Sequence, residues 1–181
     1  MPTLLPFRDY DEKDVINIYA PSGVSSLNKG TLMKVTGPGL KLDSDNPIEM
    51  LGNAGDNTAN ISNVVLQRYG VVPKMTVCGA GEGSVAIGLT LFDVRETDEN
   101  GEQLKFRPRK AAEMEVCLSG QAVPVVTRGI FAYSGVTGVS AGDKLYAGAA
   151  GALSKTVSGT AVATALGDTD ANGATVIRLH C

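Results

Sequence analysis

Residues 140–181 read SAGDKLYAGAAGALSKTVSGTAVATALGDTDANGATVIRLHC, and Gly, Ala, Ser, Thr and Val dominate this stretch. Three β-prone runs, at 143–148, 160–167 and 174–181, are separated by segments rich in Gly, Ser, Asn and Asp. Such segments favour turns, whereas Val, Ile, Thr and Tyr suit the pleated surface of a sheet. The stretch therefore predicts short, closely packed strands joined by tight turns.

The preceding residues continue the same pattern. Further β-prone runs at 31–37, 71–79, 84–94, 102–107, 114–120 and 123–133 bring the number of candidate strands to nine. Asn-Gly pairs at 100–101 and 172–173 predict hairpins with type I′ turns, which need two positive φ angles. Helix signals are confined to 53–70 and to a stretch that begins at Pro108. We expect an all-β fold, a β-barrel or β-sandwich-like body with short hairpins and at most one or two short helices.

The first 24 residues differ from this body. Pro2, Pro6 and Pro21 remove backbone donors and favour extended geometry. Residues 14–19, DVINIY, suit a strand that pairs either within its own domain or on a neighbouring molecule. We predict an extended N-terminal arm over 1–24 and a β-rich body over 25–181. The body could form two lobes, 25–118 and 119–181.

Length, charge and cysteine content narrow the class of protein. A chain of 181 residues can bury a real core, and a net charge of −3 gives no global field for holding nucleic acid. The first 16 residues contain neither a basic region nor an apolar run of signal or membrane type, so we expect a cytoplasmic chain with no membrane partner. The spacing of Cys78, Cys117 and Cys181 fits neither a metal site nor a disulfide framework, which predicts reduced thiols.

Three motifs resemble ligand-binding loops without completing them. DTDANG at 168–173 begins like a calcium loop, but position twelve is Leu179 instead of a bidentate Glu. ETDENG at 96–101 places Arg107 at that position, so both motifs are better explained as hairpin turns. GAGEGS at 79–84 has Ser84 where a dinucleotide-binding loop has its third glycine, and a strand-like run follows. We predict a simple turn there.

No set of residues suits catalysis. His180 and Cys181 are adjacent, and neighbouring residues on a strand point to opposite faces. Glu113 and Glu115 could share a strand face, but nothing distinguishes them from ordinary surface carboxylates. The sequence predicts no catalytic residue, no metal ligand and no cofactor, and therefore a protein that is not an enzyme.

Several segments resemble virion proteins. SGQAVPVVTRGIFAY at 119–133, the stretch 140–167 and GATVIRL at 173–179 are similar to the capsid decoration, or cement, proteins of tailed bacteriophages. This resemblance spans residues 119–179, about a third of the chain. Residues 91–113 and 4–20 are similar to virion proteins found with marine phage heads.

The resemblance implies a structural protein on the outer surface of an icosahedral head. Such a protein commonly forms a trimer near threefold positions, binds the major capsid protein and clamps neighbouring subunits against internal pressure. It implies assembly in the host cytoplasm and residence on the virion, with no active site. We accordingly expect a homotrimer that binds neither nucleic acid nor membrane. The alternative is a head-exposed β domain or head-fibre base that binds host-surface glycans, although five Tyr and no Trp offer little for a glycan groove.

Two surfaces are the candidates for capsid contact, namely the N-terminal arm and the charged hairpin from Arg95 to Lys110. In the hairpin, acidic and basic residues lie side by side, which suits docking onto a charged protein surface. A solvated charged face is the simpler interpretation of the same run. The candidate contact residues are Pro2, Leu4, Leu5, Phe7, Arg8, Tyr10, Ile16, Ile18, Tyr19, Arg95, Glu96, Lys105, Arg107, Arg109 and Lys110.

Overall fold

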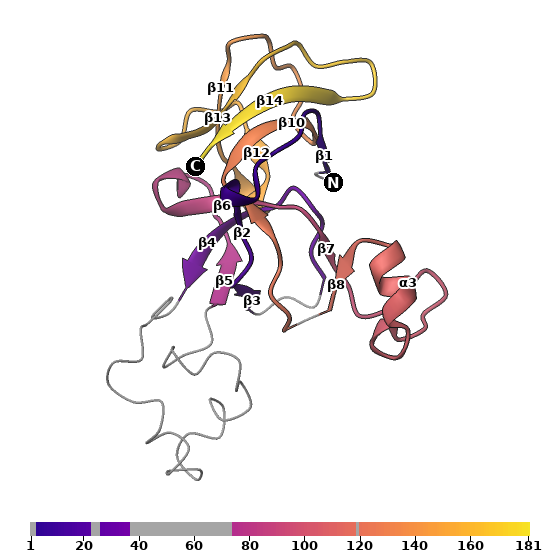
Figure 1. The fold of residues 1–181 in the computed structure, drawn as a ribbon. Helices are drawn as coiled ribbons and strands as arrows, with labels where there is room; N and C mark the ends of the chain where they lie inside the picture. The colour runs from indigo at the N-terminus through magenta and orange to yellow at the C-terminus, as the bar shows by residue number, and fades with distance from the viewer. Residues whose placement is uncertain (1–2, 23–25, 37–73, 119) are drawn as a thin grey trace, which may run out of the picture.

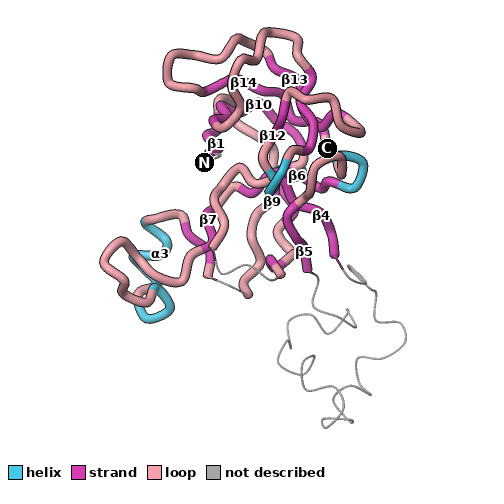
Figure 2. Tube along the Cα trace, turned by 180° about the vertical axis from the view of Figure 1, so that it is seen from behind, coloured by secondary structure: helices cyan, strands magenta, loops and turns pink. Residues whose placement is uncertain are grey.

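The computed structural model describes residues 3–22, 26–36, 74–118 and 120–181. These residues form two six-stranded sheets and one two-stranded sheet, as the sequence predicted for an all-β fold (Figures 1 and 2). The one α-helix among them is α3 (Pro108–Glu113), with proline at its first turn. The helix predicted over 53–70 lies outside the described residues.

The first sheet, sheet A, is built mainly from the C-terminal stretch and is antiparallel throughout. Its strands β10 and β14 pair over seven residues, from Arg128 opposite His180 to Ser134 opposite Ala174. In spatial order sheet A contains β1 (Thr3–Pro6), β10 (Arg128–Ser134), β14 (Ala174–His180), β13 (Ala161–Ala165), β11 (Lys144–Ala147) and β12 (Leu153–Ser154).

The second sheet, sheet B, draws mainly on the first half of the chain. It is antiparallel except where its edge strand β3 pairs with β5. In spatial order it contains β2 (Val15–Ile16), β9 (Val125–Val126), β6 (Ala86–Thr90), β4 (Leu32–Thr36), β5 (Lys74–Val77) and β3 (Ala20–Pro21). The strands β7 (Asp93–Val94) and β8 (Val116–Cys117) form the separate parallel pair.

The main core lies between sheets A and B. Strand alternation in β14 buries Thr175, Ile177 and Leu179, while Arg178 and His180 on the other face are exposed. Phe131 and Tyr133 of β10 are fully buried in the same core, and the Tyr133 hydroxyl accepts a hydrogen bond from the Leu153 backbone N–H at 2.9 Å. Sheet B contributes Leu32, Cys78, Leu89 and Val126. Sheets A and B therefore share one core. Strand β9 comes after residue 119 in the chain but belongs to sheet B, whose other strands come from the first half of the chain.

The N-terminal segment is extended and contributes strands to both six-stranded sheets. Strand β1 pairs with β10, and Leu4 is only 2% exposed in the main core. Strand β2 pairs with β9 of the same chain. Of the two pairings predicted for residues 14–19, within the chain or with a neighbouring molecule, the structure therefore has the first. Burial of Leu4 joins this segment to the body.

The predicted hairpin turns occur at both Asn-Gly pairs, but their type differs from the prediction. Only the glycines, Gly101 and Gly173, have positive φ, whereas a type I′ turn needs positive φ at both central residues. In each turn an aspartate, Asp98 or Asp170, accepts hydrogen bonds from the backbone N–H groups two and four residues later, at 2.7–2.9 Å. These bonds favour a turn with a single left-handed residue.

Candidate functional site

The candidate site is a projecting lobe, residues 95–118, which follows strand β7 and stands apart from sheets A and B (Figures 1 and 2). It contains the 3₁₀ turn η4 (Leu104–Phe106), helix α3 and strand β8. Leu104, Ala111 and Val116 are buried together, with Met114 and Leu118 packed against them. The lobe thus has a small core of its own, which gives its surface a fixed shape.

An aspartate fixes the hairpin of the lobe to its helix. The Asp98 side chain has no exposed surface and accepts from the backbone N–H groups of Asn100 and Glu102, both at 2.8 Å. The Lys110 ammonium donates to the other carboxylate oxygen. The hydrogen bond from Lys110, helped by those from the backbone, lowers the pKa of Asp98 to about 2. Lys110 is thereby committed to the interior of the lobe.

Two further cations of the lobe are paired within it. Arg107 binds Glu102 with two guanidinium nitrogens, at 2.6 and 2.8 Å, and Arg109 binds Glu113 one helical turn away at 3.1 Å. Exposed pairs of this kind add little stability, roughly 0–1 kcal/mol each. Their effect here is to compensate charge, because neither guanidinium is left without a carboxylate.

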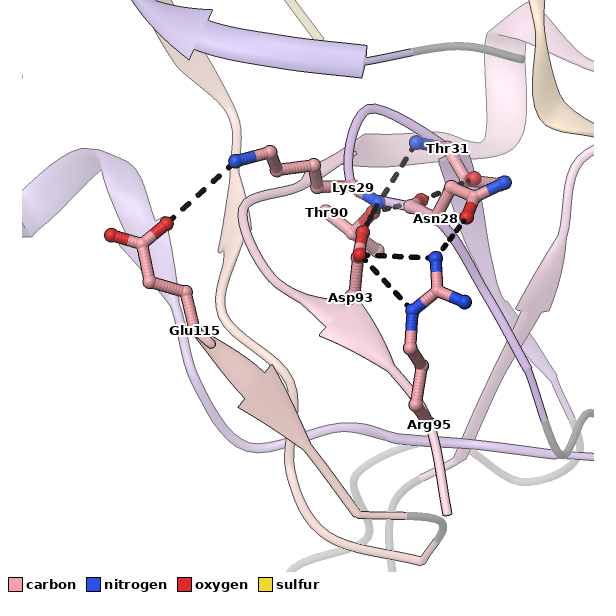
Figure 3. Close-up of polar contacts among 7 residues, drawn as sticks. All are labelled: Asn28, Lys29, Thr31, Thr90, Asp93, Arg95 and Glu115. Atoms are coloured by element: carbon pink, nitrogen blue, oxygen red, sulfur yellow. Dashed lines mark hydrogen bonds and ion pairs between the residues drawn. The ribbon is translucent and has the colours of Figure 1, made fainter. Parts of the chain in front are cut away.

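A polar network holds the base of the lobe on sheet B (Figure 3). The Asp93 carboxylate accepts from the Lys29 backbone N–H at 2.7 Å and from the Arg95 guanidinium at 3.3 Å. The same guanidinium donates to the Asn28 side-chain oxygen at 3.0 Å. The buried Thr90 hydroxyl donates to the Asn28 carbonyl at 3.2 Å. Arg95 therefore connects the lobe to the 28–31 loop.

A second contact crosses the base of the lobe. Lys29 Nζ lies 3.7 Å from Glu115 Oε2, just before strand β8 (Figure 3). Glu115 has a φ of +52°, a left-handed conformation that costs a non-glycine residue about 1–2 kcal/mol. Glu115 lies between α3 and β8, so Lys29 contacts the residue at which the chain turns from the helix into the strand.

One large apolar side chain of the lobe is left uncovered. Phe106 is 76% exposed, and Lys105 Nζ lies 4.9 Å from the centroid of its ring. Beside it, Glu96, Gln103, Lys105 and Leu118 line a cavity of about 220 Å³. An aromatic ring next to a cation, on a rigid support, is the composition typical of an interface anchor.

A larger cavity of about 610 Å³ lies at the base of the lobe. It is lined mainly by polar residues, and two of its four acidic side chains are paired, because Asp93 binds Arg95 and Asp98 binds Lys110. The residues that line it are Ser26, Asp93, Arg95, Glu96, Thr97, Asp98, Glu99 and Met114.

The structure divides the predicted contact residues into two groups that lie in different parts of the molecule (Figure 1). In the N-terminal segment Leu4 is buried, Ile16 and Tyr19 are half-buried, and Leu5, Phe7, Arg8, Tyr10 and Ile18 are exposed. In the lobe Arg95 and Lys110 are half-buried in ion pairs, Arg107 and Arg109 are exposed in ion pairs, and Glu96 and Lys105 are exposed. Pro2 lies outside the described residues.

Sequence reasoning missed Phe106. The run 102–107 was predicted as a strand, in which Phe106 would share the face of Leu104. The chain forms a 3₁₀ turn instead, so Leu104 is buried while Phe106 is exposed. The available signal was that Phe106 is the only aromatic residue in the basic run 105–110.

The other motifs occupy ordinary structural positions. Glu82 in the 79–84 turn binds Lys34 and the Gly79 backbone N–H, both at 2.5 Å, and the strand β6 follows as predicted. Burial raises the pKa of Cys181 to about 12, and the His180 ring lies on the other face, 3.1 Å from Thr164 Oγ1. In the described ranges no group of three or more His, Cys, Asp or Glu is placed to hold a metal ion.

The chain matches no protein-family model, and neither curated proteins nor solved structures gave a significant match. No helix in the described part of the chain is long and apolar enough to cross a membrane.

Proposed function

We propose that this chain is a structural virion protein that binds the outer surface of a tailed-phage head and cements neighbouring major capsid subunits. The observation that carries the proposal is Phe106, a large aromatic side chain that is 76% exposed at the surface of the projecting lobe. The resemblance of residues 119–179 to capsid decoration proteins supports the capsid as partner. Trimeric assembly and residence on the virion belong to the same proposal.

The construction of the lobe supports docking onto a protein surface. The ion pairs of Arg107, Arg109 and Lys110 are formed before any partner arrives, so little side-chain entropy remains to be lost there on binding. Lys105 takes part in no ion pair among the described residues and is the cation left to meet a carboxylate of the partner. Phe106 and Lys105 together offer an apolar anchor and a charge that sets orientation.

The mechanism is contact at more than one point. The exposed Leu5 and Phe7 lie on β1 and directly after it, at the edge of sheet A, away from the lobe (Figure 1). A molecule that engages one capsid subunit through the lobe and another through this edge gains effective concentration for the second contact. Two weak contacts of this kind make a clamp.

Cosedimentation with heads tests the proposal. Heads of the phage that encodes the chain, prepared without it, are mixed with the purified protein or with Phe106→Ala. Val157→Ala is the matched control, since Val157 is 77% exposed but lies between β12 and β13. We expect Phe106→Ala to weaken binding roughly 30-fold, corresponding to about 2 kcal/mol, and the control to bind like the wild type.

Wild-type protein that does not pellet with heads would contradict the proposal. A glycan array run on the same sample tests the alternative, because a strong glycan signal without head binding would favour a host-attachment domain. Equal loss of binding in both variants would indicate that Phe106 is not the anchor.

A further inference from the structure

The outward face of sheet A carries a group of positive charges opposite the main core. Alternation along β10 and β14 directs Phe131, Ile177 and Leu179 inward. It therefore places Arg128 and Arg178 on the outward face, where both are exposed. The two strands run side by side in Figure 1.

The strand register brings these cations together. Arg128 lies directly opposite His180, and Ile130 lies directly opposite Arg178, so the two arginines are diagonal neighbours. Such neighbours on one face have Cα atoms roughly 7–8 Å apart. Lys144 extends the group across the sheet, because Thr164 pairs with both Arg178 and Lys144.

These cations lack internal compensation. Arg128, Lys144 and Arg178 take part in none of the eight ion pairs formed within the described part of the chain. The acidic residue next to Lys144 in sequence, Asp143, is occupied by Lys155 at 2.8 Å. In the projecting lobe, by contrast, nearly every cation forms an ion pair with a carboxylate. The cluster is positive although the whole chain has a net charge of −3.

A cavity lies at the end of the β10–β14 pair where Arg128 is opposite His180. Arg128, Gly129, Ile130, Arg178, Leu179 and His180 line this cavity of about 350 Å³. Next to it at the sheet edge, Phe7 is 60% exposed, and its backbone N–H donates to the Ile130 carbonyl at 3.1 Å. An extended segment lying in this hollow would meet guanidinium groups along its length and an aromatic ring at one end.

We propose that this face, defined by Arg128, Lys144, Arg178 and His180, is a docking site for an acidic, carboxylate-rich segment of a partner protein. Charge complementarity selects the occupant, because guanidinium groups bind carboxylates in a bidentate fork. Single-stranded nucleic acid is a poorer fit, since its binding sites also present aromatic platforms for successive bases, and the six described residues that line this cavity include no Phe, Tyr or Trp. This site is distinct from the projecting lobe and stands whether or not the partner of the lobe is a capsid.

The test uses fluorescein-labelled octaglutamate as the probe, with octaglutamine and the oligonucleotide dT8 as comparators, in fluorescence anisotropy at low salt. The variant is Arg128→Gln with Arg178→Gln in the full-length chain. The control is Lys74→Gln with Lys13→Gln, which changes the net charge equally but involves exposed side chains outside sheet A. Near- and far-ultraviolet circular dichroism confirms that both variants fold.

We expect octaglutamate to bind the wild type and the control alike, and the double variant to bind at least roughly tenfold more weakly. Added salt should reduce wild-type binding. Absence of octaglutamate binding, equal weakening in the control, or tighter binding of dT8 than of octaglutamate would each overturn the proposal. A fall in oligomeric mass of the double variant by light scattering would also overturn it, because a second copy would then be the occupant.

Discussion

Replacing Leu4 by alanine tests whether the N-terminal strand is part of the core. Leu4 is 2% exposed and packs in the main core with residues of β10 that lie about 130 positions later in the chain. Leucine-to-alanine changes in cores cost about 2–5 kcal/mol. Because β1 is an edge strand and can partly close the cavity, we expect a loss of about 3 kcal/mol in the free energy of unfolding.

Leu5 is the matched control because it is the adjacent leucine, pairs with the same strand and is 55% exposed. Leu5→Ala should cost less than about 1 kcal/mol. The assay is urea unfolding followed by circular dichroism. With a slope of about 2 kcal/mol per molar, the midpoint should fall by about 1.5 M for Leu4→Ala and by less than 0.5 M for Leu5→Ala. Equal shifts, or a shift below about 0.3 M for Leu4→Ala, would refute the assignment of β1 to the core.

Three other predictions follow from buried polar groups and thiols. The lowered pKa of Asp98 means that its stabilisation is present above the ordinary carboxyl pKa of 3.8 and is lost as the pH falls through about 2; the protection factors of amides in the projecting lobe against hydrogen exchange should therefore fall between those values, and unchanged protection factors at pH 2 would contradict this. Tyr133→Phe should cost about 1–3 kcal/mol in urea unfolding, because the buried Leu153 N–H loses its acceptor; a loss below 0.5 kcal/mol would contradict it. Burial raises the pKa of Cys78 to about 11 and of Cys181 to about 12, so iodoacetamide at pH 8 should alkylate Cys78 roughly 100-fold and Cys181 roughly 1000-fold more slowly in the folded than in the unfolded chain, and equal rates would contradict it.

The strands could be predicted because their signal is local. Every run predicted as a strand contains one, except 102–107. In β14 the sequence itself shows the alternation, because the buried Thr175, Ile177 and Leu179 alternate with more exposed residues such as Arg178 and His180. The hairpin positions followed from the Asn-Gly pairs for the same reason. The turn type was wrong because the side chains of Asp98 and Asp170 bind backbone N–H groups within their own turns.

The failures share a dependence on distant residues. Burial of Leu4 requires pairing of β1 with β10, which no local pattern encodes, so the sequence predicted an extended segment but not the strand with which it pairs. In the run 102–107, Leu104 packs against Ala111 and Val116, and Pro108 begins a helix directly afterwards. These contacts favour a compact turn. A strand at the same place would be supported by only one bridge, between Gln103 and Thr97.

The sequence indicated a charged surface from Arg95 to Lys110, but not how its charges pair. The run from Arg95 to Lys110 does form an exposed projecting surface, but its charges could not be sorted from sequence alone. Lys105 and Lys110 have the same chemistry, yet Lys110 binds a buried carboxylate while Lys105 faces solvent beside Phe106. Only the three-dimensional arrangement distinguishes a structural cation from one available to a partner.

The most direct test of the proposed function is site-specific photocrosslinking at position 106. A photoreactive phenylalanine analogue is placed at residue 106 or, as the control, at residue 157, and each protein is irradiated on heads that lack the wild-type chain. We predict a crosslink to the major capsid protein from position 106 and none from position 157. No crosslink from position 106, or equal crosslinking from both positions, would contradict the proposal that the projecting lobe docks on the capsid.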